Sequence, residues 1–239
     1  MMRVQQQPAY ILHHRPFRDS SQIIDVLTRD HGRLSLMSRG SRSARSHTKA
    51  SLQVFTPLLL GWAGRGELPT VTSVELQQNS ESGKPLRLTG KALPSAFYVN
   101  ELLVRLLHQH DVHEGIYHLY ASVIGLLGQG EEIEPVLRLF EKQLLEALGF
   151  GLNLNSNADT GEPLQADEEY AYYLEHGPVS FATVKDELFI TRLRGESLLN
   201  LQQNRLQTEQ SLKDAKRLMR SILNYYLQGK PLKSRELFR

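Results

Sequence analysis

The first third of the chain consists of short apolar or alternating runs separated by turn-forming residues. The runs cover residues 9–12, 23–28, 33–37, 54–60 and 71–76, and the turn formers include Arg15-Pro16, Asp30 to Gly32, Gly61 to Gly66 and Pro69. Five short strands in one segment predict a small closed barrel, for which the five-stranded OB-fold is a frequent solution. The longest gap, from Ser38 to Leu52, falls where that fold usually has its helix or long loop.

From Leu93 onward the apolar positions recur at helical spacing. Three amphipathic helices are predicted over residues 97–107, 116–127 and 136–148, the last opening after Pro135 and closing at Gly149. Residues 151–169 are polar and predict a loop, residues 170–191 favour short strands, and residues 212–227 predict a last helix ended by Gly229 and Pro231.

The expected fold class is therefore α+β. An N-terminal OB-fold barrel (residues 1–80) precedes an α-helical bundle domain (residues 81–239), which carries a small β-leaning insertion at about 150–195.

The charge is strongly segregated although the net charge is only +2. Residues 1–50 carry nine Lys/Arg against three acids, residues 101–180 carry three against fourteen, and residues 181–239 carry twelve against six. Two cationic ends around an acidic middle indicate an anionic partner that contacts the ends.

Composition excludes several classes of protein. The chain has no Cys, so disulfides, thiolate nucleophiles and cysteine-ligated zinc are impossible. The N-terminus lacks the apolar segment of a signal peptide, and no apolar run approaches the roughly 20 residues needed to span a bilayer. We expect a cytoplasmic protein without membrane contact.

One basic segment predicts nucleic-acid binding. Between His31 and Ala50 there is no acid, and the cations are Arg33, Arg39, Arg42, Arg45 and Lys49. Guanidinium groups pair bidentately with phosphate oxygens, so we interpret this segment as a phosphate-contacting element of salt-sensitive affinity. The alternative is a solvated basic loop that serves solubility.

Two aromatic residues near this segment are candidates for stacking on bases. Phe17 is expected in the first inter-strand loop and Trp62 in the fourth, the loops that flank an OB binding face. The alternative for each is core packing.

A second basic element is the predicted last helix. Lys213, Lys216, Arg217 and Arg220 are expected on one side and apolar residues on the other. The simpler interpretation is a solvated helix face; the sharper one is an apolar groove with a cationic rim, suited to an acidic peptide with aromatic residues.

Catalytic and metal signatures are weak. His108, His110 and His113 with Glu114 match no standard metal spacing, and the acidic clusters at residues 131–134 and 167–169 are expected to be solvated. We expect no metal, no cofactor and no enzymatic activity.

Several motifs together resemble the RecO family of bacterial recombination mediators. They are YILHHRPFRDSSQIIDVLTRDHGRLSLMSRGSRSARS, LQVFTPLLLGWAGRGEL, YVNELLVRLL and the terminal GKPLKSRELFR, and the similarity extends over essentially the whole chain. Many relatives also carry four cysteines as a zinc site after an LGFG-like turn; this chain keeps Leu148 to Gly151 but has no Cys.

The resemblance implies a function in recombinational DNA repair. Such proteins bind single- and double-stranded DNA, anneal complementary strands, bind RecR and the C-terminal tail of single-stranded DNA-binding protein, and help RecA to load. By analogy the DNA site would be the basic barrel segment. The tail site would use the helical domain, with Arg138, Lys213, Lys216 and Arg217 as carboxylate partners and Arg220 on the same helix. A protein-interaction scaffold with incidental DNA contact is the alternative.

Overall fold

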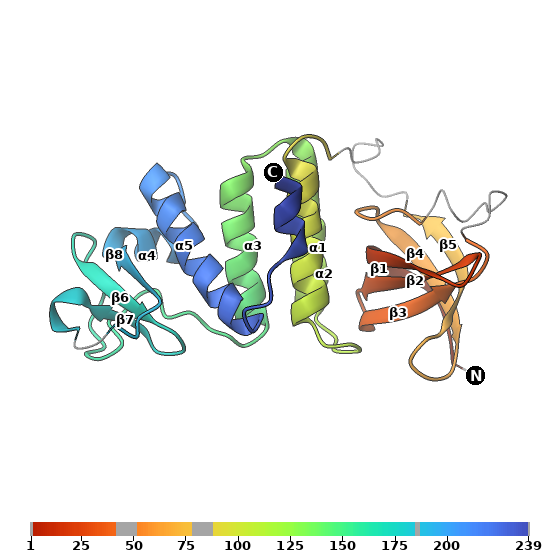
Figure 1. The fold of residues 1–239 in the computed structure, drawn as a ribbon, viewed down its shortest axis with the longest axis horizontal. Coiled ribbons are helices and arrows are strands. Elements are labelled where there is room, and N and C mark those ends of the chain that lie inside the picture. The colour runs from red at the N-terminus through yellow and green to blue at the C-terminus, as the bar shows by residue number, and fades with distance from the viewer. Residues whose placement is uncertain (1, 42–51, 78–87, 185–186, 239) are drawn as a thin grey trace. The chain divides into compact units, whose positions relative to one another are not determined.

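The computed structural model describes residues 2–41, 52–77, 88–184 and 187–238. They form two compact units (Figure 1). The first contains residues 1–130 and 232–239, and the second contains residues 131–231. The chain thus leaves the first unit after the second long helix and returns to it at its C-terminal end. The expected division at residue 80 remains a prediction.

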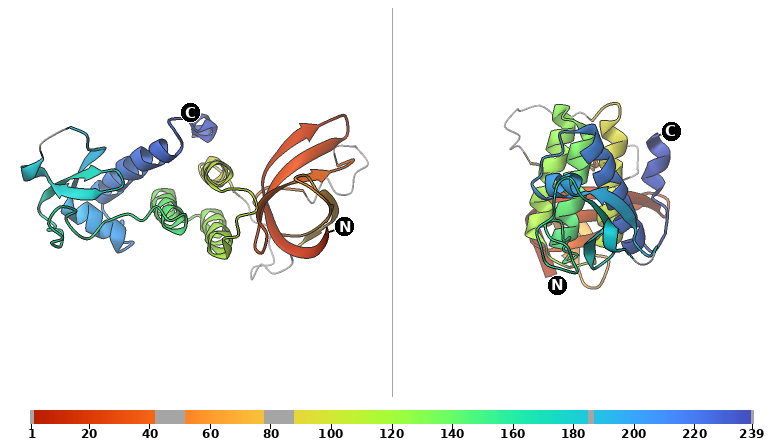
Figure 2. Two further views of the ribbon diagram at one scale, coloured as in Figure 1. Left: turned by 90° about the horizontal axis from the view of Figure 1, so that it is seen from below. Right: turned by 90° about the vertical axis from the view of Figure 1, so that its left-hand side faces the viewer.

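The first unit is built on a closed five-stranded barrel. Its strands are β1 (Met2–Phe17), β2 (Ser21–Thr28), β3 (Gly32–Ser38), β4 (Leu58–Gly64) and β5 (Thr70–Leu76), in the order β1-β2-β3-β5-β4. The left view of Figure 2 shows these strands curling into a ring. Alternate residues such as Ile24, Val26, Leu34 and Leu36 fill its core. With the helices and the small sheet that follow, the barrel confirms the expected α+β class and OB-like start.

The fourth strand lies later than expected because its glycines extend it rather than turn it. Gly61 sits opposite Ser73, and a Cβ at Gly61 would lie 2.4 Å from the Ser73 Oγ. Trp62 pairs with Val4 on β1 and Val71 on β5, so it is a strand residue and not a loop residue. The prediction of a turn over Gly61 to Gly66 was wrong for its first half, where glycine relieves crowding between strands.

β1 also runs further than the sequence suggested. Arg15 and Pro16 pair with Ile23 and Gln22 of β2 instead of forming a turn, and Phe17 pairs with Ser21. The tight turn therefore comprises residues 18–20.

Two helices of the first unit, α1 (Ala92–Leu106) and α2 (Glu114–Gln129), pack on the outside of the barrel. The buried Asn100 amide donates to the Leu12 carbonyl at 2.7 Å and accepts from the Tyr120 hydroxyl at 2.8 Å. Tyr10 of the barrel contacts the Tyr117 and Tyr120 rings at centroid distances of 5.5 and 4.9 Å. Burial raises the pKa of Tyr120 well above its ordinary value, so its hydroxyl keeps the proton that it donates.

The turn between β2 and β3 meets the connection between α1 and α2 at backbone distance. Gly32 has φ +66°, and a Cβ there would lie 2.1 Å from the carbonyl oxygen of Asp111. Beside it, the His110 amide donates to the Arg33 carbonyl at 2.8 Å. Glycine is required here both for its positive φ and for the close approach.

The C-terminal segment η3 (Lys233–Phe238), a 3₁₀ helix, is held by a carboxylate on α1. The Glu101 oxygens accept from the Lys233 amide at 3.0 Å and the Ser234 amide at 2.8 Å, and Arg105 pairs with the same carboxylate at 2.6 Å. Burial acts to raise the pKa of Glu101, but the amides and Arg105 lower it further than burial raises it, so the net shift is downward.

The second unit comprises α3 (Ile133–Ala147), a small sheet, α4 (Gly195–Gln202) and α5 (Glu209–Tyr226). The sheet has the order β7-β6-β8, formed by β6 (Glu169–Tyr173), β7 (Gly177–Ser180) and β8 (Thr191–Arg194), with the 3₁₀ turn η2 (Phe181–Thr183) after β7. α3 begins at Ile133, which places Pro135 in its first turn, where its missing amide costs nothing. The sequence reading missed α4 because two turns are too short to display a period.

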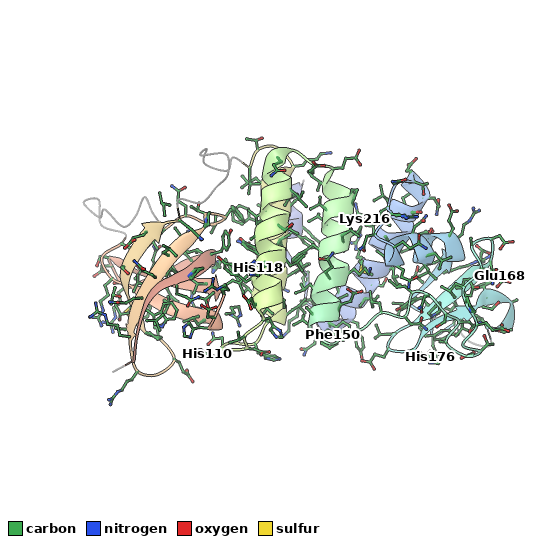
Figure 3. All side chains as sticks on the ribbon, turned by 180° about the vertical axis from the view of Figure 1, so that it is seen from behind. His110, His118, Phe150, Glu168, His176 and Lys216 are labelled. Atoms are coloured by element: carbon green, nitrogen blue, oxygen red, sulfur yellow. The ribbon has the colours of Figure 1, made fainter. Side chains whose placement is uncertain are left out.

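The loop between α3 and β6 is ordered by asparagine side chains. Asn153 Oδ1 accepts from the backbone amide of Ser156 at 3.2 Å, and Asn157 Oδ1 accepts from the amide of Asp159 at 3.0 Å. Asn153 Oδ1 also accepts from the Asn155 amide at 3.4 Å, so both asparagines form Asx turns, in which a side chain replaces a backbone acceptor. His176, labelled in Figure 3, joins this loop to the β6–β7 turn through Asp159 at 2.9 Å.

We predict that Gly32→Ala lowers the free energy of unfolding by about 2–4 kcal/mol, since it adds a left-handed backbone penalty to a clash with Asp111. The matched control is Gly40→Ala. Gly40 has φ +65°, and among the described residues no atom would lie within 4 Å of its Cβ, so that variant should lose only about 1 kcal/mol. Urea unfolding compares the two, and equal losses would show that the backbone contact with Asp111 contributes nothing.

We predict that Glu101→Gln lowers stability in a pH-dependent way. Because the pKa of Glu101 is lowered on folding, its contribution is complete above the unfolded pKa and is lost as pH falls through the folded pKa. Wild type should exceed the variant by about 1–2 kcal/mol at pH 7, and the two should converge in acid. Thermal unfolding across pH measures this, with Glu67→Gln on an exposed loop as control. A difference that is independent of pH would contradict this origin.

Candidate nucleic-acid interface

OB-folds bind oligonucleotides on the outer face of strands 2 and 3 and through flanking loops, and β1 lies next to this face as the neighbour of β2. Strand register assigns three rows to this face, because the alternate residues point into the core. The rows are Tyr10–Leu27–Arg33, His13–Asp25–Ser35 and Arg15–Ile23–Met37. Within the middle row, Ser35 Oγ donates to Asp25 at 2.5 Å and His13 lies 3.8 Å from the same carboxylate.

The row nearest the helices is covered by α1, α2 and their connection. Tyr10 packs against α2, and Leu27 is fully buried. The Arg33 Nε donates to the Leu107 carbonyl at 3.0 Å, and Gln109 Nε2 donates to Ser35 Oγ at 3.2 Å. Partial burial of the Arg33 guanidinium lowers its pKa. Half of the usual OB face is therefore occupied by the protein itself.

The far end of the same face is exposed and cationic. We define the barrel rim as His13, Arg15, Phe17, Arg18 and Arg39. Arg15 and Arg39 are exposed, and Arg39 directly follows Ser38, which pairs with Gln22 of β2. The Arg18 guanidinium lies over the Phe17 ring, 5.3 Å from its centroid. The acids beside the rim among the described residues are Asp19, in the tight turn, and Asp25, next to His13; against three arginines they leave an excess of positive charge.

The structure distributes the predicted DNA-binding residues unequally. Arg39 and the half-buried Phe17 lie on the barrel rim. Arg33 lies under the α1–α2 connection and Trp62 lies in the core, where His31 contacts its ring edge-on at 5.3 Å. Arg42, Arg45 and Lys49 fall outside the described residues.

Sequence reasoning missed Arg15 and Arg18 because Arg15-Pro16 was interpreted as a turn. The signal was present in the alternation that continues through Pro16, which places the Arg15 and Phe17 side chains on one face of the strand. Proline is compatible with that interpretation when a strand is bent or interrupted in its pairing.

The exposed side of α5 is a second cationic surface, in the second unit. Lys213 pairs with Glu209 at 2.6 Å, and Lys216, labelled in Figure 3, pairs with Glu134 of α3 at 2.7 Å. Arg217 pairs with the buried Asp214 at 2.9 Å and donates to the Arg192 carbonyl. Arg220 is exposed on the same helix. We call these four residues the α5 cation row.

Arg138 does not belong to that exposed row. Its side chain is 6 % exposed and pairs with Glu141, itself buried, at 2.6 Å within α3. Lys142, one turn further, donates to the Gln202 carbonyl at 2.9 Å and to Asn204 at 3.0 Å beyond the end of α4. These cations act inside the unit, where removal of one partner from a buried pair is strongly destabilising.

Among the described residues no three His, Asp or Glu side chains are arranged to hold a metal ion. His113 bonds Asp111 at 3.0 Å and His118 pairs with Glu114 at 3.7 Å, so these histidines have carboxylate partners within their own segment. No helix in the described part of the chain is long and apolar enough to cross a membrane.

Comparison with known proteins agrees with this architecture. The model of the family "Recombination protein O N terminal" matches residues 2–79, and that of "Recombination protein O C terminal" matches residues 87–236. The chain is 43% identical over 236 residues to the DNA repair protein RecO of Nitrosococcus oceani, covering 99% of this chain and 93% of that protein. It is 41% identical to the protein of the same name from Methylococcus capsulatus (97% and 91% covered) and 41% identical to that from Coxiella burnetii (98% of each).

Proposed function

The chain belongs to the RecO family of DNA repair and recombination proteins, and on this premise we propose that it is a mediator that binds single- and double-stranded DNA through the barrel rim. The observation that carries the proposal is the convergence of Arg15, Arg18 and Arg39 at the uncovered end of the OB face. Arg42, Arg45 and Lys49 follow Arg39 in sequence and would extend the same positive field.

Phosphate recognition is the chemistry that this rim supports best. Arginines present several donors in a planar fork that matches phosphate oxygens, and each neutralised phosphate releases counterions. Affinity should therefore fall steeply with salt and depend little on sequence. In this proposal Arg33 positions the neighbouring helices, while Phe17 and the exposed arginines contact the strand.

The proposal includes the partners that the family resemblance implies. The protein would anneal complementary strands, bind RecR, and help RecA to load onto DNA coated by single-stranded DNA-binding protein, acting at the nucleoid. The α5 cation row would bind the acidic tail of that coating protein, because Lys213, Lys216, Arg217 and Arg220 are exposed on one helix. It would act without covalent catalysis or a cofactor.

A protein-interaction scaffold with incidental DNA contact is the second candidate. The observation that favours it is the α5 cation row itself. Lys213 and Lys216 form ion pairs with Glu209 and Glu134, and the carboxylates of an acidic peptide would take the place of these two glutamates. The two candidates differ in whether DNA binding through the barrel is needed for annealing.

We predict that Arg15→Gln combined with Arg39→Gln weakens binding to single-stranded DNA and reduces the slope of log affinity against log salt by about 1.5, because two phosphate contacts are lost. Fluorescence anisotropy at several salt concentrations measures both quantities. Arg205→Gln, which removes an exposed charge in the second unit, should leave the slope unchanged. An unaltered slope in the double variant would refute the proposed site.

We predict that Lys213→Ala combined with Arg220→Ala weakens binding of an acidic, aromatic-ended peptide by about five- to tenfold, since two charge contacts are removed. DNA affinity should stay within about twofold, and Arg205→Ala serves as the control for loss of an exposed cation elsewhere in the second unit. The scaffold candidate would be favoured if annealing survived Arg15→Gln with Arg39→Gln but failed in this α5 variant.

A further inference from the structure

The barrel segment is poor in accessible aromatic rings. Residues 1–91 contain four residues of the Phe, Tyr and Trp type, namely Tyr10, Phe17, Phe55 and Trp62. Tyr10, Phe55 and Trp62 are 8%, 7% and 3% exposed. Tyr10 packs on α2, Phe55 meets Phe97 of α1 edge-on at 5.0 Å, and Trp62 belongs to the barrel core. None of the three has a ring face open to a nucleobase.

Phe17 is the remaining ring, and it already has a neighbour. It is half-buried, and the Arg18 guanidinium lies over it. The sequence of residues 42–51 and 78–87, which lie outside the described residues, contains no Phe, Tyr or Trp. The exposed imidazoles of His13 and His14 face each other at 6.5 Å with an interplanar angle of 21°.

OB-folds that grip single strands normally combine a cationic groove with several aromatic platforms on which bases stack. Here half of the surface where such platforms would stand is covered by α1, α2 and their connection, at the row Tyr10, Leu27 and Arg33. What stays uncovered is the barrel rim, whose polar groups suit phosphates. The barrel thus keeps the cationic groups that contact the backbone of a single strand, but it lacks most of the aromatic rings on which bases would stack.

We propose that the barrel holds a DNA strand by its sugar–phosphate backbone and leaves the bases unstacked on protein, so that their pairing edges stay free for a complementary strand. This inference rests on the proposed DNA-binding function and specifies its mode. A strand held in this way needs no release of bases before it pairs, which is the requirement for annealing.

The test compares three single-stranded probes of equal length with the full-length protein: ordinary DNA, a strand made of abasic sites, and a strand with neutral methylphosphonate linkages. We expect the abasic strand to bind within about threefold of ordinary DNA with the same salt slope, and the methylphosphonate strand to lose nearly all affinity. Loss of two stacked bases would weaken binding by at least about tenfold. A tenfold or greater loss with the abasic strand would overturn the inference.

The same experiment separates this inference from the function on which it rests. If ordinary DNA does not bind, or binds equally well to Arg15→Gln with Arg39→Gln, the proposed DNA site is wrong. If ordinary DNA binds in the expected salt-dependent way but abasic DNA does not, only the backbone grip is wrong. A strand containing 2-aminopurine gives an independent reading: its fluorescence should change little on binding, whereas strong quenching would indicate stacking on protein.

Discussion

The contact between the barrel and the α1–α2 pair, here called the seam, determines which part of the barrel surface in the first unit stays exposed. Its centre is Asn100, whose buried amide bonds the Leu12 carbonyl of β1 on one side and the Tyr120 hydroxyl on the other. A buried amide left without these partners would cost more than the bonds themselves contribute, so the seam has one allowed register. Gly32 lets the β2–β3 turn approach the backbone of Asp111, between α1 and α2, closely, and this approach is part of the same contact.

Because this seam occupies half of the outer face, only the other half is open for the nucleic-acid contact that we propose. The covered half includes Tyr10 and Arg33, whereas Arg15, Arg18 and Arg39 lie on the uncovered half. A surface of guanidiniums on which the one aromatic ring of the Phe, Tyr and Trp type, Phe17, is half-buried beneath Arg18 favours contacts to phosphates, which every sequence and both strand states share. In our proposal, therefore, the outer face of this OB-fold contacts nucleic acid through phosphates and hardly through stacking of bases on aromatic rings.

In the second unit, polar side chains order a loop and form ion pairs along a helix. The chain has no Cys, and the stretch after α3 is held by bonds from backbone amides to the Asn153 and Asn157 side chains and by a bond between His176 and Asp159. On α5, Lys213, Lys216 and Arg217 pair with Glu209, Glu134 and Asp214, and Arg220 is exposed. Exposed pairs of this kind contribute little stability, which leaves them open to exchange with an acidic ligand.

The alternating and helical periods of the sequence by themselves indicated five barrel strands and the long helices, and counts of charged residues showed the segregated charge. The periods did so because burial on one face imposes a period of two on strands and about 3.6 on helices. The clustered basic residues of 31–50 likewise carried the expectation of a nucleic-acid partner, and the combined motifs carried the family. The absence of Cys decided against a cysteine zinc site without any structure.

Tertiary structure alone decided which cations remain available. Arg33 and Arg39 stand six residues apart in one basic segment, yet one is bonded to the Leu107 carbonyl and the other is exposed. Trp62 in a glycine-rich stretch looked like a loop residue until pairing with β1 and β5 placed it in the core. Arg138 resembled a surface cation until its burial beside Glu141 appeared. A one-dimensional pattern records which side of its own element a residue occupies, but whether another element covers that side depends on contacts between residues distant in sequence.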